Sequence, residues 1–104
     1  MLTEKERTQF FALLLAFVTA TGASGRNCSA LFSVSPVTMA RWIRAARGRD
    51  SVERMFYNKI EPIIYTINRL NAYNAKHHVF DAVARIDDAE QKVAALRHLA
   101  AKAA

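Results

Sequence analysis

The chain has few residues that interrupt a helix. Its 104 residues contain three glycines and two prolines, and alanine, leucine, arginine, lysine and glutamate dominate the segments between them. Runs of β-branched residues that alternate with polar ones, which are typical of half-buried strands, are missing. Since 52% of the residues are apolar, the chain has enough apolar side chains for a core. We therefore predict an all-α fold, a helical bundle made of one compact unit with a C-terminal appendage.

Cysteine is almost absent too. Cys28 stands alone, so the chain cannot form an internal disulfide, and no second cysteine stands with a histidine at the spacing of a metal site. We expect Cys28 to be a small buried side chain whose thiol pKa is raised. The three histidines are expected on the surface. We predict no metal and no cofactor, and a single thiol fits a reducing cytoplasm.

One hydrophobic run, FFALLLAFV at residues 10–18, stands out. Together with the small residues up to residue 25, it has features of a signal peptide. However, Glu4 and Glu6 offset the two basic residues before the run, and the run is too short to span a bilayer as a helix. We favour a buried first helix, keep the signal peptide as the alternative, and expect no membrane partner.

Signatures of enzymes are missing as well. The sequence has no glycine-rich phosphate loop, and no serine or cysteine nucleophile lies near a histidine in a strand-turn-helix setting. Asp87, Asp88 and Glu90 fall in a segment rich in exposed charge. We therefore predict that the protein is not an enzyme and has no small-molecule substrate.

Positive charge is abundant and unevenly distributed. The formal net charge is +6 and the isoelectric point is near 10.0. Residues 26–59 contain seven basic and two acidic residues, which gives 7 − 2 = +5 for this third of the chain. A surplus of this kind favours an anionic partner such as nucleic acid.

Local signals predict two helices before residue 34. Thr3 followed by Glu6 is a capping box, so the first helix begins there, and it ends near Gly22. A short second helix is expected over residues 26–33, with its cap at Asn27 or in the preceding loop.

A third helix is predicted directly after this. Ser35 is well placed as its N-cap and Pro36 as its first residue, where the missing N–H has no intrahelical partner. Met39 and Trp42 lie on one apolar stripe, and Gly48 supplies a left-handed exit.

A fourth helix is expected to begin at a capping signature formed by Asp50 and Glu53. Pro62 interrupts its pattern, so we predict a kink or a restart near residues 60–61. With this helix, residues 1–75 are predicted to form one domain.

Two short helices with a tight connection, the second starting at a capped Ser-Pro, have the geometry of a helix-turn-helix. The stretch VSPVTMARW at residues 34–42 resembles the turn and recognition helix of bacterial and phage transcriptional regulators of this type. The resemblance covers residues 26–47. It departs at Ser33, where these regulators usually have glycine, and at Ser29, where alanine commonly packs between the two helices.

The resemblance implies a DNA-binding surface on the third helix. Val34, Met39 and Trp42 would face inward and fix the crossing of the two helices. The residues expected to contact bases are Pro36, Val37, Thr38 and Arg41. The residues expected to contact the DNA backbone are Arg26, Asn27, Ser35, Arg44, Arg47 and Arg49.

Apolar residues recur with a heptad period from residue 79 to residue 103, which predicts a long C-terminal amphipathic helix in residues 76–104. This helix could complete a monomer by packing on the first and fourth helices, or it could pair with a second copy. We favour a homodimer, because helix-turn-helix regulators read two half-sites. The predicted interface residues are Val79, Ala82, Ile86, Ala89, Val93, Leu96 and Ala100.

Taken together, these features predict a cytoplasmic, sequence-specific transcriptional regulator of phage, prophage or plasmid type. It would bind double-stranded DNA as a dimer through residues 36–47. One alternative is a DNA-binding packaging protein similar to phage small terminase subunits, which would form larger oligomers. The other alternative is a protein-interaction adaptor that does not bind DNA.

Overall fold

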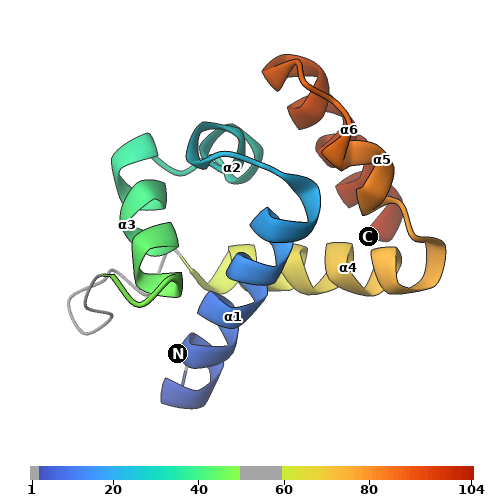
Figure 1. Ribbon diagram of the computed structural model, residues 1–104. Helices are drawn as coiled ribbons and strands as arrows, with labels where there is room; N and C mark the ends of the chain where they lie inside the picture. Colours follow the sequence, from blue (N-terminus) through green and yellow to red (C-terminus); the bar gives the residue numbers. More distant parts are fainter. Residues whose placement is uncertain (1–2, 50–59) are drawn as a thin grey trace.

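The computed structural model describes residues 3–49 and 60–104 of the chain. This part contains six helices and no strand, which confirms the all-α prediction (Figure 1). The helices are α1 (Glu4–Thr21), α2 (Gly25–Phe32), α3 (Pro36–Ala46), α4 (Glu61–His77), α5 (Phe80–Ala84) and α6 (Ala89–Ala103).

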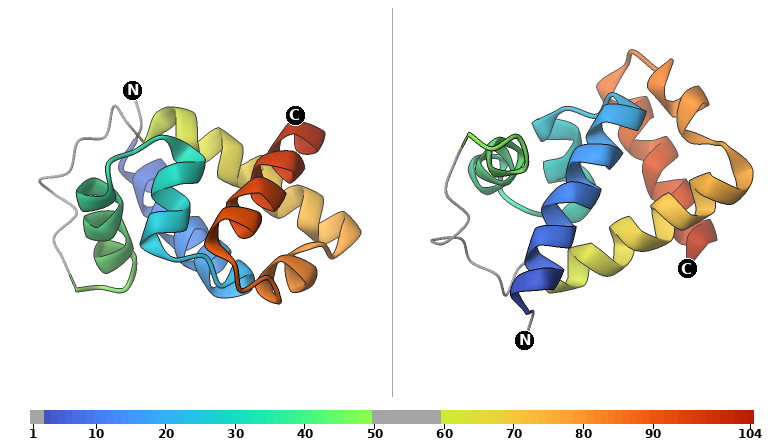
Figure 2. Two further views of the ribbon diagram at one scale, coloured as in Figure 1. Left: turned by 90° about the horizontal axis from the view of Figure 1, so that it is seen from above. Right: turned by 60° about the horizontal axis from the view of Figure 1, so that its bottom comes forward.

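Helix α1 is the centre of the core. Phe10, Leu14 and Phe17 are completely buried, because α1 contacts α3, α4 and α5 (Figure 2). The Phe10 ring meets Trp42 of α3 edge to face at 5.6 Å, and the Phe17 ring meets Phe80 of α5 in the same way at 5.6 Å. A helix that is apolar around most of its circumference needs cover on several sides, and α1 receives it.

The local signals at the start of the chain are confirmed. Thr3 and Glu6 form the capping box of α1, and Gly22 ends this helix with a left-handed φ of 65°. Helix α4 starts at Glu61 with Pro62 in its first turn, at the position predicted for a kink or a restart. The capping signature at residues 50 and 53 lies outside the described residues.

No single helix in the described ranges is long and apolar enough to cross a membrane. Taken together, α1 and α2 have the length and apolar composition of a membrane-spanning segment, but the two helices are bent by 114° at the break between them.

The prediction of one C-terminal helix over residues 79–103 is wrong. The chain forms the short helix α5, and residues 85–88 separate it from α6. Asp88 caps α6, since its carboxylate accepts a hydrogen bond of 2.8 Å from the Gln91 N–H. The heptad count runs across this break, so its positions do not lie on a single helical face.

The seven residues of the predicted dimer interface therefore differ in their exposure. Val93 and Leu96 are buried within the chain, where α6 packs on α2 and α4, and they are closed to a second copy. Ala82 and Ala89 are exposed, whereas the other three, Val79, Ile86 and Ala100, are half-buried.

The hydrophobic core continues across residue 75. Phe80, Val83 and Leu96 belong to the same buried cluster as the residues of α1 and α3. The radius of gyration of 12.9 Å is close to the value of about 13 Å expected for one compact domain of 100 residues. The C-terminal helices thus pack onto the body of the molecule, and the domain boundary at residue 75 stays a prediction.

Candidate nucleic-acid interface

Helices α2 and α3 are joined by three residues, 33–35. Ser24 caps α2, because its hydroxyl accepts from the Asn27 N–H at 3.1 Å while the Asn27 side chain accepts from the Ser24 N–H at 2.9 Å. Ser33 ends α2 in the left-handed conformation, with φ 56° and ψ 44°. This is the position where the resembling regulators usually have glycine, and a left-handed residue explains that preference.

Ser29 ties the connection to α2. Its carbonyl accepts a hydrogen bond of 3.2 Å from the Val34 N–H, and its hydroxyl donates to the Val34 carbonyl. Ser29 is itself buried. The serine at this position, where alanine would only pack, therefore adds a hydrogen bond that holds the turn.

The inner face of α3 is fixed in the core. Met39 is completely buried, Trp42 is 1% exposed, and Ile43 is buried beside them. The edge-to-face contact of Trp42 with Phe10 locks α3 against α1. The prediction that Trp42 is a core residue is confirmed, and its burial sets which face of α3 is open to solvent.

The four residues expected to contact bases lie at the N-terminal part of α3. Val37 is 73% exposed, which is unusual for an apolar side chain, and Pro36 and Arg41 are exposed beside it. Thr38 is half-buried. The Ser35 hydroxyl caps the Thr38 N–H at 3.2 Å and donates to the Thr38 hydroxyl oxygen at 2.9 Å. Thr38 thus has a structural role in the cap of α3.

Five of the six residues expected to contact the DNA backbone are exposed: Arg26, Ser35, Arg44, Arg47 and Arg49. Asn27 differs from the prediction. It is 7% exposed, and its side chain forms the cap of α2, so it has little surface for a phosphate. The sequence pointed to Ser24 only as part of the loop before α2.

Positive charge is concentrated in the α2–α3 part of the chain. No acidic residue occurs between Arg7 and Arg49, so every charged side chain from residue 26 to residue 49 is an arginine. The acidic residues Asp81, Asp87, Asp88 and Glu90 are exposed around α5 and the start of α6. Helix α3 lies on the opposite side of the molecule from α5 (Figure 2), whereas Glu90, at the start of α6, lines a hollow together with Arg26 of α2. The surplus of arginine in residues 26–49 favours an anionic partner at α3.

Cys28 is completely buried in α2, and burial raises the pKa of its thiol to about 12. This confirms the prediction of a small buried residue. The three histidines are exposed, as expected. Within residues 3–49 and 60–104, no three histidine, cysteine or carboxylate side chains are arranged to hold a metal ion.

Comparisons with protein families, with curated proteins and with solved structures give no match for this chain. The interpretation of the α2–α3 unit therefore depends on its residues and geometry.

Proposed function

We propose that the protein binds double-stranded DNA through α3, with α2, the connection and α3 acting as a helix-turn-helix. The observation that carries the proposal is the two-sided character of α3. Its inner face is locked by Trp42, while Val37 and the arginines of its outer face point to solvent. A helix held rigidly by one face and presenting arginine on the other suits the major groove.

The exposed residues fall into two groups, those suited to contact bases and those suited to contact phosphates. Arg41 can donate two hydrogen bonds to O6 and N7 of guanine, and Val37 can contact the methyl group of thymine. Both precede the last turn of α3, as expected for the part of a recognition helix that enters the groove. Arg26, Arg47 and Arg49 suit the phosphates, which strengthen binding without selecting a sequence.

Base contacts on α3 favour a regulator that recognises a defined operator, of the phage, prophage or plasmid type. The test is fluorescence anisotropy of random and genomic DNA fragments at about 50 mM and about 200 mM salt. For a protein with four or five phosphate contacts, this increase in salt should weaken binding roughly a hundredfold or more. We expect salt-sensitive binding that selects one sequence class. Absence of binding at the lower salt concentration would refute the proposal, and a ring-sized mass of the protein would favour the packaging alternative.

The role of Arg41 is tested by Arg41→Ala with Arg85→Ala as the matched control. Arg85 is exposed and directly follows α5, a helix that lies away from α3 (Figure 2). Arg41→Ala should cost about 1–3 kcal/mol on the selected sequence and much less on others. Arg85→Ala should leave both affinities unchanged. An equal loss on all sequences for Arg41→Ala would make Arg41 a phosphate contact.

A further inference from the structure

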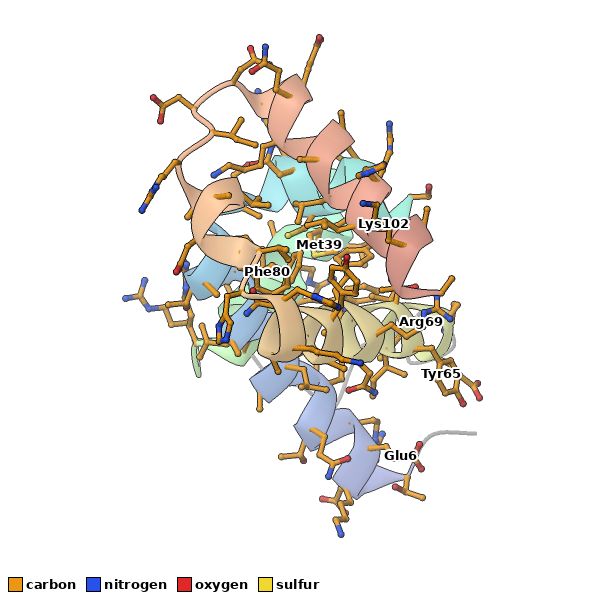
Figure 3. All side chains as sticks on the ribbon, turned by 90° about the vertical axis from the view of Figure 1, so that its right-hand side faces the viewer. Glu6, Met39, Tyr65, Arg69, Phe80 and Lys102 are labelled. Carbon is orange, nitrogen blue, oxygen red and sulfur yellow. The ribbon has the colours of Figure 1, made fainter. Side chains whose placement is uncertain are left out.

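A second exposed apolar side chain lies away from α3. Tyr65 of α4 is 56% exposed, and within the described ranges only Val37 is a more exposed large apolar residue. Tyr65 and Arg69 extend outward from the same side of α4 (Figure 3). Pro62, one turn before Tyr65, is also exposed. This face of α4 therefore offers an apolar centre to a partner.

Tyr65 has an acidic residue on one side along the helix and a basic residue on the other, each four residues away. Glu61 lies four residues before Tyr65, and Arg69 lies four residues after it, so all three lie on one ridge of the helix. The Arg69 guanidinium donates a long hydrogen bond of 3.5 Å to the Thr66 hydroxyl, which keeps it on this face.

An open groove of about 480 Å³ runs beside this ridge. It lies between the α2–α3 connection and the first turns of α4, and its lining residues are Leu31, Phe32, Ser33, Val34, Ser35, Pro62, Ile63 and Thr66. Leu31, Phe32 and Val34 are only half-buried in the chain itself. The groove adds apolar side chains on this side of Tyr65, next to the polar side chains of Ser33, Ser35 and Thr66.

We propose that this face of α4 is a homodimer interface, in which two α4 helices pack antiparallel around a two-fold axis near Tyr65. A two-fold axis brings the same surface of both subunits together. In an antiparallel pair, the first residue of the ridge therefore faces the last residue of the partner's ridge, and these two residues must be complementary. The ridge of α4 meets this requirement, because Glu61 faces the partner's Arg69 and Arg69 faces the partner's Glu61. Ridges of residues four apart are also those that interlock most often between packed helices.

The charge pattern selects a second copy over DNA as the occupant. The ridge carries one acidic and one basic residue and so has no net charge, whereas a DNA-binding face needs a positive surplus. A single helix ridge is a small surface compared with the roughly 1,200–2,000 Å² of a stable complex, so we expect a weak dimer with a dissociation constant on the order of micromolar.

Sedimentation equilibrium of the full chain without DNA tests the proposal, over roughly 1 μM to 1 mM protein. We expect a monomer–dimer equilibrium. Glu61→Arg and Arg69→Glu should each raise the dissociation constant about tenfold or more, because like charges then face each other. An equimolar mixture of the two variants should associate at least as well as the unmodified chain, since every charge then meets its opposite.

The controls separate this effect from misfolding and from DNA binding. Arg85→Glu makes the same charge change as Arg69→Glu outside α4 and should leave the equilibrium unchanged, and circular dichroism verifies that each variant is helical. Tyr65→Glu should also give a monomer. A monomer at every concentration, a dimer that all of these variants leave intact, or a mixture that fails to associate would overturn the proposal. None of these variants changes a residue proposed to contact DNA, so DNA binding is measured separately.

Discussion

At the scale of single residues, Ser33 carries backbone strain at the point where the candidate interface is built. A non-glycine residue in the left-handed region costs roughly 1–2 kcal/mol, which glycine avoids while losing more entropy on folding. Ser33→Gly should therefore raise the free energy of unfolding by about 0.5–1 kcal/mol. Urea denaturation measures this change. Ser33→Ala, which keeps the strain, is the control, and an equal gain from both substitutions would contradict the explanation.

Cys28 is expected to make stability depend on alkaline pH. Its folded pKa of about 12 lies above the ordinary value of 9.0, so the native state keeps a proton that the unfolded chain releases. The contribution is complete below about pH 9 and falls as the pH rises from there toward about 12, by at most about 1.4 kcal/mol per pH unit.

The variant Cys28→Ala isolates this effect from the other groups that titrate at high pH. Its deficit in unfolding free energy relative to the unmodified chain should be smaller at about pH 10.5 than at about pH 8. Urea denaturation at both pH values, under reducing conditions, gives the two deficits. Equal deficits would show that the buried thiol does not control the dependence.

At the scale of helices, α1 depends on a residue far away in sequence. Lys92 of α6 is 6% exposed, and its ammonium donates to the carbonyl of Thr21 at 3.0 Å. The last turn of α1 has no basic residue of its own, so Lys92 supplies the positive charge that the C-terminus of a helix favours. The hydrogen bond also joins α6 to α1.

Lys92→Met keeps the length of the side chain and removes its charge and hydrogen bond. We expect the free energy of unfolding to fall by about 1.5–3 kcal/mol, as for other hydrogen bonds to charged groups. Lys102→Met, at an exposed position of the same helix, should change it by less than about 0.5 kcal/mol. Thermal or urea unfolding compares the two variants. Similar losses of unfolding free energy from both would show that the Lys92–Thr21 hydrogen bond does not stabilise the fold.

The helices that could be predicted are those whose ends are encoded locally. Thr3 with Glu6 and Ser35 with Pro36 place two helix starts correctly, because each cap acts within three residues. The break before α6 had a local signal as well, since Asp88 stands three residues before Gln91. The heptad pattern was followed across residue 88, so this signal was not used in the prediction. A contact between residues 21 and 92 has no local signal and emerges only from the packed fold.

At the scale of the whole molecule, periodicity separates inside from outside only where one face is covered. It predicted correctly that Met39 and Trp42 are buried, because α3 has one covered face. It did not identify Tyr65 as an exposed side chain, since how much of the edge of α4 stays open depends on where α1 and α6 pack. Asn27 was expected to contact DNA because its local pairing with Ser24 in the cap of α2 was not recognised.

The measurement that tests the central claim most directly is an NMR titration of the labelled protein with a selected DNA duplex. If α3 binds DNA, backbone amide shifts should concentrate from Val37 to Arg49 and in the first turn of α2, and added salt should reverse them. Amides of α5, and those of α6 away from its contact with α2, should change little. Shifts that concentrate on α5 and α6, or their absence at low salt, would contradict the assignment of α3 as the DNA-binding helix.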